Sequence, residues 1–150
     1  MTKISIRVAN INDAEDISKL IIKTLQGSNT KDYSTKIIEE VIKSFSPTKI
    51  TSRMQQRQIF IAVEENELIG TASLEKNMIR SVFVLPSKQG KKVGLQLMTY
   101  LENTAKAQNI HHLIVPSSIT AEGFYKKLDY KVVGEEYYGE ERTIIMEKHL

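Results

Sequence analysis

The segment SKQGKKVG, residues 87–94, places two glycines and three lysines within eight positions. An apolar run, IRSVFVLP, precedes it, and a helical pattern of apolar residues follows from about residue 92. A strand, a glycine-bearing loop and a helix start together favour anion binding, because the first helical N–H groups lack intrahelical partners and the helix dipole is positive there. From the residues alone, a phosphate-binding loop and a plain basic turn are equally good interpretations.

The spacing of the glycines excludes two well-known phosphate-binding loops. A P-loop needs four residues between its glycines and then Lys-Ser or Lys-Thr. Here three residues separate Gly90 from Gly94, and Leu95 and Gln96 follow. A dinucleotide-binding loop needs three glycines in a fixed pattern, which this segment lacks.

The elements that must position this loop follow from the hydrophobic periodicity. Asn12 and Glu15 stand at capping-box spacing before a helix that Gly27 can close. The segment 78–116 has the order strand, loop, helix and strand, which is typical of a crossover between parallel neighbours. We predict strands over 4–9, 59–64, 68–77, 78–86, 111–118, 130–135 and 142–150, and helices over 12–27, 34–45, 92–108 and from about 121, with a short helix near 48–58, a tight turn near 65–67 and a loop over 136–141.

This order predicts a mixed α/β (α+β) fold in one domain, residues 1–150. The central sheet is expected to be mostly antiparallel with one parallel strand pair and flanking helices. The length suits a single domain with its own core. His111 and His112 fall at a helix-to-strand junction, and adjacent positions point in different directions, so we predict a surface role for them and no metal site.

Composition narrows the classes of function. The chain has 41% hydrophobic and 26% charged residues and a net charge of +3, which permits an anionic ligand without indicating nucleic acid. It has no cysteine, which excludes disulfides, thiol catalysis and cysteine-bound zinc. No signal peptide and no membrane-spanning run is visible, so a cytoplasmic protein without nucleic-acid or membrane partners is expected.

Two motifs resemble those of the GNAT family of N-acetyltransferases. The segment VLPSKQGKKVGLQLM is similar to the family's acetyl-CoA-binding segment, in which Gln/Arg-x-x-Gly-x-Gly/Ala opens a helix after a strand ending in Val-x-Pro. Residues 89–94 fill those six places, with Lys92 where the first fixed glycine is usual. The segment SSITAEGFYKKLDY resembles the family's later motif through Ser118, Ala121 and Tyr125, with Asp129 where glycine is usual. The order of elements agrees over nearly the whole chain.

The resemblance implies a GNAT-like sheet whose parallel strands splay apart around acetyl-CoA, with no metal. The backbone of the strand would bond the pantetheine amides, and the N–H groups of the loop would hold the pyrophosphate. The expected cofactor-binding residues are Val82, Phe83, Val84, Gln89, Gly90, Lys91, Lys92, Val93, Gly94, Leu95, Ser118, Ala121 and Tyr125.

The same resemblance implies direct transfer of an acetyl group to an amine. Tyr125 is expected to give a proton or a hydrogen bond to the leaving thiolate, although its ring could instead be a packing residue. An amine must lose a proton before it attacks, and the strand 78–85 carries no carboxylate. Glu75, just before that strand, is the nearest candidate base, and a relayed water is an equal alternative.

The acceptor is expected to be a small-molecule or peptide amine. Asp32, Tyr33, Tyr137 and Tyr138 fall in loops expected to border its site, where aromatic and acidic groups suit a cation. Lys126 and Lys127 could contact the cofactor's 3′-phosphate or form a solvated helix face. The chain is expected to be a monomer or a homodimer. The alternatives are a non-catalytic acyl-CoA-binding module of the same fold and a basic nucleic-acid-binding module.

Overall fold

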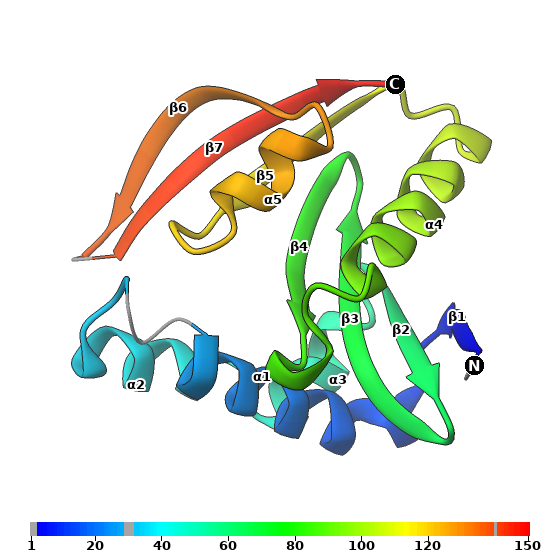
Figure 1. Ribbon diagram of the computed structural model, residues 1–150, viewed down its shortest axis with the longest axis vertical. Helices are drawn as coiled ribbons and strands as arrows, with labels where there is room; N and C mark the ends of the chain where they lie inside the picture. The colour runs from blue at the N-terminus through cyan, green and yellow to red at the C-terminus, as the bar shows by residue number, and fades with distance from the viewer. Residues whose placement is uncertain (1–2, 29–31, 140) are drawn as a thin grey trace.

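The computed structural model describes residues 3–28, 32–139 and 141–150. The described strands form one seven-stranded sheet in the order β1-β2-β3-β4-β5-β7-β6, and only β4 and β5 are parallel (Figure 1). The predicted mixed sheet with one parallel pair is therefore confirmed. In chain order the elements are β1 (Ile4–Val8), η1 (Ile11–Asp13), α1 (Ala14–Ser28), α2 (Thr35–Lys43), α3 (Pro47–Arg53), β2 (Gln58–Glu64), β3 (Glu67–Glu75), β4 (Met78–Val84), η3 (Pro86–Lys88), α4 (Val93–Ala107), β5 (His112–Ser117), α5 (Glu122–Lys127), β6 (Lys131–Tyr138) and β7 (Glu141–His149).

Helices cover both faces of the sheet around β2 and β3. Phe60 packs edge-on against Tyr100 of α4, with ring centroids 5.4 Å apart. Its neighbour Ile59 and Ile17 of α1 line the same small pocket. Because successive strand residues point to opposite faces, α4 covers one face and α1 covers the other. This double cover keeps the central strands buried on both sides and forms the core.

The parallel strands β4 and β5 separate almost as soon as they meet. Their register contains the single pair Met78 and Ile114 among the described residues, and the two strands diverge beyond it in Figure 1. Two local features favour this divergence. Ser81 adopts a φ of 53° where the β3–β4 register shifts, which marks a bulge in β4. Pro116 of β5 has no N–H to donate to a neighbouring strand.

A short 3-10 helix, η1, precedes α1, and the capping residue lies earlier than the sequence predicts. The capping box forms between Asn10 and Asp13, rather than between Asn12 and Glu15, so that prediction was wrong. Asp13 accepts a hydrogen bond from the Asn10 N–H at 2.8 Å and also binds the Arg7 guanidinium through two contacts of 2.9 Å. Asp13 therefore closes the box and binds the arginine on β1 at the same time.

The C-terminal hairpin is longer than predicted, and the short third helix is confirmed at Pro47–Arg53. Much of the expected loop 136–141 is strand, because the register continues through the pairs Tyr137–Arg142 and Tyr138–Glu141. Aromatic residues favour strands, and backbone pairing here outweighs the polar, turn-like composition of the segment. The extension carries the end of the hairpin to the cleft described below.

Candidate active site

A cleft of about 840 Å³ lies along the diverging parts of β4 and β5. Its volume is within the range of about 300–1,000 Å³ that is usual for cofactor and small-molecule sites. The fold brings nearly all of the predicted cofactor-binding residues to this cleft. Those lining it are Val82, Phe83, Val84, Gln89, Gly90, Lys92, Val93, Gly94, Leu95, Ser118, Ala121 and Tyr125, whereas Lys91 does not line it.

Strand β4 supplies one wall of the cleft through Val82, Phe83 and Val84. Because β4 pairs with β5 only at Met78, its later backbone groups on that side are not used by β5. The Val84 carbonyl accepts a hydrogen bond from the Gln89 side-chain amide at 3.0 Å. This contact fastens the glycine loop to the end of β4, and it occupies one of the acceptors expected to face pantetheine.

The loop before α4 turns through two left-handed residues. Gly90 has a φ of 79° and Lys92 has a φ of 65°. The first backbone bond back into the helix runs from the Gln96 N–H to the Lys92 carbonyl at 3.0 Å. The N–H groups of Val93 and Gly94 therefore have no partner within the helix. Together with the helix dipole, they form a cradle suited to a phosphate group.

The left-handed backbone at Lys92 gives a physical reason why glycine is usual at this position. A non-glycine residue pays about 1–2 kcal/mol in this region, because its Cβ crowds the backbone. The Lys92 side chain is exposed and makes no cap hydrogen bond to α4. The departure from the motif therefore adds local strain at Lys92, and the lysine side chain takes no part in capping α4.

The lysines around the loop have different surroundings. The Lys88 ammonium contacts Glu64 at 2.7 Å, and this carboxylate raises the pKa of Lys88. Lys126 pairs with Glu122 at 2.7 Å on α5. Lys92 and Lys127 line the cleft. Lys88 lines the cleft as well, so three lysines border the space that an anion would occupy, and one of them is already paired with a glutamate.

Helix α5 forms the wall opposite β4. Its approach is shaped by Ser118, whose hydroxyl accepts a hydrogen bond from the Ala121 N–H at 3.2 Å. The Ser118 carbonyl accepts from the same N–H at 3.2 Å. This turn leads into the helix that carries Tyr125. The spacing of the three motif residues therefore has a structural origin: Ser118 accepts the hydrogen bonds of the turn, Ala121 donates them, and Tyr125 lines the cleft.

Tyr125 lies at the cleft with most of its side chain buried. The residue is 4% exposed, and its ring packs edge-on against Phe124 and Tyr130. Burial raises the pKa of Tyr125 well above the ordinary value of about 10. The phenol therefore stays protonated over the whole neutral range and can act as a proton or hydrogen-bond donor. Tyr130 holds the ring from behind and donates its own hydroxyl to Glu102 at 2.7 Å.

The structure places Glu75 away from Tyr125 and outside the residues that line the cleft. It ends β3, where it is the register partner of Met78. Its carboxylate contacts Arg57 at 3.4 Å and Arg80 at 4.0 Å. These contacts pair Glu75 with Arg57 and with Arg80, which itself lines the cleft, and they agree with the role of a hairpin-end residue that the sequence also allowed.

A different carboxylate reaches the cleft. Glu141, at the start of β7, is the single carboxylate among the described residues that line it. Burial raises the pKa of Glu141. In the sequence, Glu141 falls in the segment 136–141, a loop expected to border the acceptor site, but no spacing motif marks it. Its position depends on how far the C-terminal hairpin extends, which the sequence did not reveal.

Aromatic residues from distant segments surround the same end of the cleft. Tyr33 and Tyr138 line it, whereas Tyr137 is exposed and does not. The Tyr33 hydroxyl accepts a hydrogen bond from the Ile119 N–H at 2.6 Å and donates one to the Arg142 carbonyl at 3.1 Å. It ties the segment before α2 to both the approach to α5 and the start of β7.

The segment before α2 makes a second contact of this kind. Asp32 accepts a hydrogen bond from the Thr120 hydroxyl at 2.9 Å. Asp32 does not line the cleft, although it was expected to border the acceptor site. Its carboxylate therefore secures the loop that leads into α5.

Comparison with known proteins agrees with this arrangement. A family profile described as "Acetyltransferase (GNAT) domain" matches residues 29–150. A GCN5-related N-acetyltransferase from Rhodopseudomonas palustris is 25% identical, with a TM-score of 0.93 over 100% of this chain and 98% of that chain. The PaiA N-acetyltransferase from Thermoplasma acidophilum, solved in complex with coenzyme A, is 24% identical, with a TM-score of 0.84 over 99% of each chain.

A more distant structural likeness extends to an aminoglycoside 6′-N-acetyltransferase complexed with coenzyme A. It is 18% identical, with a TM-score of 0.71 over 97% of this chain and 96% of that chain. At this identity the likeness shows the fold. No protein of curated function matches the sequence. None of the helices in the described residues is long and apolar enough to cross a membrane.

Proposed function

This chain belongs to the GNAT family of acetyltransferases, and we propose that its residues 1–150 form one domain that transfers an acetyl group from acetyl-CoA to a primary amine. The observation that carries the proposal is the meeting, in one cleft, of a helix-start anion cradle and a buried, protonated tyrosine. The two features come from segments about 30 residues apart in the sequence, and the splayed strands provide the space between them.

The cleft suits coenzyme A in its donor set and shape. The N–H groups at the start of α4 would hold the pyrophosphate, with Lys92 at the cleft beside them. The space beside the left-handed Gly90 is open, as shown by a Cβ added there, which would meet no atom within 4 Å. The edge of β4 at Val82 and Phe83 would receive the extended arm of the molecule, as a sheet edge receives another strand. Acetyl-CoA, when bound, supplies the acetyl group as a thioester.

Tyr125 acts as the proton donor in this proposal. As the bond between acetyl carbon and sulfur breaks, the sulfur gains negative charge, and a phenol at that position can neutralise it. The raised pKa of Tyr125 ensures that the proton is present at neutral pH. Packing against Phe124 and Tyr130 limits the motion of the ring. The residue is thus held before the reaction begins.

Glu141 acts as the proton acceptor. A protonated amine cannot attack a carbonyl, because its lone pair is occupied, so a base must remove the proton first. Glu141 lies at the cleft, and burial raises its pKa toward the pH at which an enzyme works. Its negative charge also attracts a cationic acceptor. Tyr33 and Tyr138 beside it offer aromatic surface to the same group.

The acceptor class is a small-molecule or peptide amine. The cleft walls are formed by this one chain, and the charged groups among the described residues that line them are Glu141, Arg80 and the lysines Lys88, Lys92 and Lys127. A compact or terminal amine can enter such a space without a separate substrate-binding domain. The proposal does not require a metal ion for the transfer.

The direct test is release of free coenzyme A thiol from acetyl-CoA in the presence of polyamines, amino acids, aminoglycosides and peptides. The proposal expects release that depends on one class of amine, together with an acetylated product of added mass. If acetyl-CoA raises the melting temperature and no amine in the panel gives a product, the chain is instead an acyl-CoA-binding module. If acetyl-CoA neither binds nor reacts, both readings fail.

A further inference from the structure

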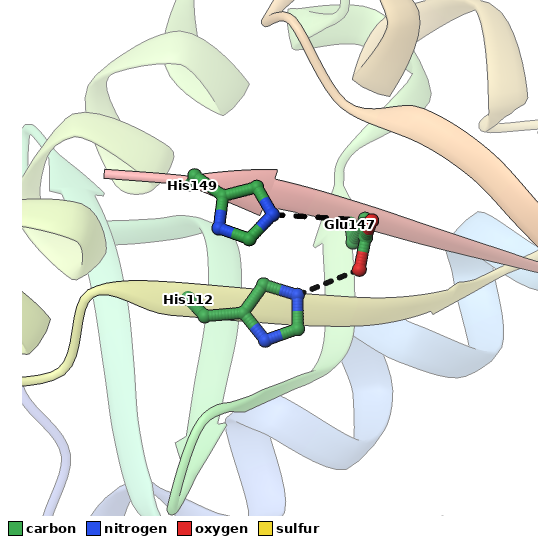
Figure 2. A group of neighbouring side chains, drawn as sticks. All are labelled: His112, Glu147 and His149. Carbon is green, nitrogen blue, oxygen red and sulfur yellow. Dashed lines mark hydrogen bonds and ion pairs between the residues drawn. The ribbon is translucent and has the colours of Figure 1, made fainter.

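Two histidines from different strands lie face to face at the other end of β5 and β7. His112 begins β5, and His149 is its direct register partner near the end of β7. Their imidazole rings are stacked, with centroids 4.6 Å apart and an interplanar angle of 16° (Figure 2). In the sequence His112 stands beside His111, but in the sheet it stands beside His149. Thirty-six intervening residues hide this pair from any spacing motif.

A carboxylate completes the group on the same face of the sheet. Glu147 precedes His149 by two positions, so the two side chains emerge on one side of β7. The His112 Nε2 atom lies 2.7 Å from a Glu147 carboxylate oxygen, and the His149 Nε2 atom lies 4.0 Å from the other oxygen. Figure 2 shows both rings presenting a nitrogen to this carboxylate. One ligand atom from each residue falls within 4.8 Å of the other two.

We propose that His112, Glu147 and His149 form a binding site for a divalent transition-metal ion of the zinc class. Two imidazole nitrogens and one carboxylate oxygen are a ligand set that zinc uses, with water in the remaining position. Ligand atoms about 2.0–2.1 Å from a tetrahedral ion are roughly 3.3 Å apart. Binding an ion therefore requires side-chain rotations that bring the present separations of 2.7 and 4.0 Å to that value. A hard cation such as Mg²⁺ prefers an all-oxygen set and is not the expected ligand.

Neighbouring charges define the strength of the site. Lys131 on β6 is the register partner of Glu147, so it emerges on the same face and opposes a cation. Lys148 points to the opposite face, where it contacts Glu102 at 3.1 Å. The side chain of His149 is 77% exposed, which leaves room for water on the ion. The expected affinity is therefore that of a partly open site with one nearby positive charge.

The site is separate from the proposed acetyl-transfer cleft. His112 and Ser117 stand at opposite ends of β5, five residues apart, which is about 17 Å along a strand. A bound ion would tie β5 to β7 at one end, while the other ends of the same strands line the cleft. Because the ion binds the folded arrangement, it would stabilise the fold without taking part in the transfer.

The test measures metal binding to the untagged full chain after treatment with a chelator. We expect one Zn²⁺ per chain by equilibrium dialysis, a rise in melting temperature with Zn²⁺, and no comparable rise with Mg²⁺. His112→Ala, Glu147→Gln and His149→Ala should each weaken Zn²⁺ binding about tenfold or more. Lys131→Ala should bind at least as tightly as the unaltered chain.

The matched control is His111→Ala, which removes an exposed histidine adjacent in sequence to the site but outside it. This variant should keep the full affinity and stoichiometry. The proposal is overturned if His111→Ala weakens Zn²⁺ binding as much as His112→Ala, or if the triple variant of the three ligands still binds one ion. Melting temperatures measured without metal identify any variant that does not fold. If the alanine variants do not fold, the Zn²⁺ affinity of Glu147→Gln, which keeps the side-chain shape, decides the test. Acetyl transfer plays no part in these measurements, so their outcome is independent of the proposed function.

Discussion

Gly94 and Phe124 are in contact across the cleft, and the absence of a side chain at Gly94 makes this contact fit. A Cβ added to Gly94 would lie 2.9 Å from Cε1 and 3.0 Å from Cζ of the Phe124 ring. Gly94 belongs to the first turn of α4, whereas Phe124 precedes Tyr125 on α5. The glycine therefore sets how closely the anion cradle and the helix of the proposed proton donor approach each other.

Replacing Gly94 by alanine should move these two helices apart. We expect Gly94→Ala to weaken acetyl-CoA binding and to lower stability by about 1–3 kcal/mol, because overpacking forces the ring or the helix to shift. Isothermal titration and thermal unfolding measure the two effects. Gly123→Ala is the matched control, since a Cβ there meets nothing within 4 Å, and it should raise helix stability by up to about 1 kcal/mol. Equal behaviour of the two variants would show that the Phe124 contact is unimportant.

Removing the hydroxyl of Tyr125 should affect the chemical step alone. We expect Tyr125→Phe to lower kcat by about one to three orders of magnitude with little change in acetyl-CoA affinity, because the phenylalanine keeps the ring packing and loses the proton donor. Burial raises the pKa of Tyr125. The activity of the unaltered chain should therefore not fall through deprotonation of Tyr125 as the pH rises to 10. Turnover unchanged by the substitution would remove Tyr125 from the mechanism.

Replacing Glu141 should change the pH dependence of the reaction. A base works in its charged form, and the raised pKa of Glu141 places its protonation at a higher pH than for an ordinary carboxyl group. We therefore expect kcat/KM to fall as the pH drops toward the acidic range, and Glu141→Gln to lose both activity and this acidic limb. Glu75→Gln is the control, because Glu75 lies with Arg57 outside the cleft. A loss of the acidic limb in Glu75→Gln alone would assign the base to Glu75 instead.

Changing Lys92 to glycine should relieve backbone strain. Its φ of 65° is costly for lysine and available to glycine, so Lys92→Gly should be more stable by up to about 1 kcal/mol after the larger chain entropy of glycine is counted. Lys91→Gly, at a position without a positive φ, should gain nothing. Denaturant unfolding compares the two. If Lys92→Gly binds acetyl-CoA as tightly as the unaltered chain, the lysine side chain does not hold the cofactor.

The capping box at Asp13 should make stability depend on acid. Arg7 holds the pKa of Asp13 below its usual range. The charged carboxylate therefore stabilises the fold above about pH 4, and this contribution disappears as the pH falls through the lowered pKa. Asp13→Asn should cost roughly 1 kcal/mol at pH 7 and little at the acid end. Glu15→Gln, which alters an exposed pair with Lys19, should change stability by much less. An equal loss at every pH would contradict this origin.

Local patterns in the sequence were sufficient to predict the order of the elements and to propose the cofactor loop. Periodicity showed the strand before Gly90 and the helix after it, and the motif spacing identified Ser118, Ala121 and Tyr125. These features depend on residues close together in the chain, where backbone geometry follows directly from residue type. Lys92 was recognised as a departure in the same way, but only the backbone showed that its cost is a left-handed conformation.

Long-range register decided what local patterns could not. Whether Glu141 reaches the cleft depends on where the C-terminal hairpin ends, and the extra pairs through Tyr138 carry it there. His149 likewise meets His112 only because β5 and β7 pair in one particular register. A one-residue slip would turn either side chain to the other face. The sequence by itself therefore determined the family and the local chemistry of the loop, whereas the tertiary structure decided which distant charged groups share one site.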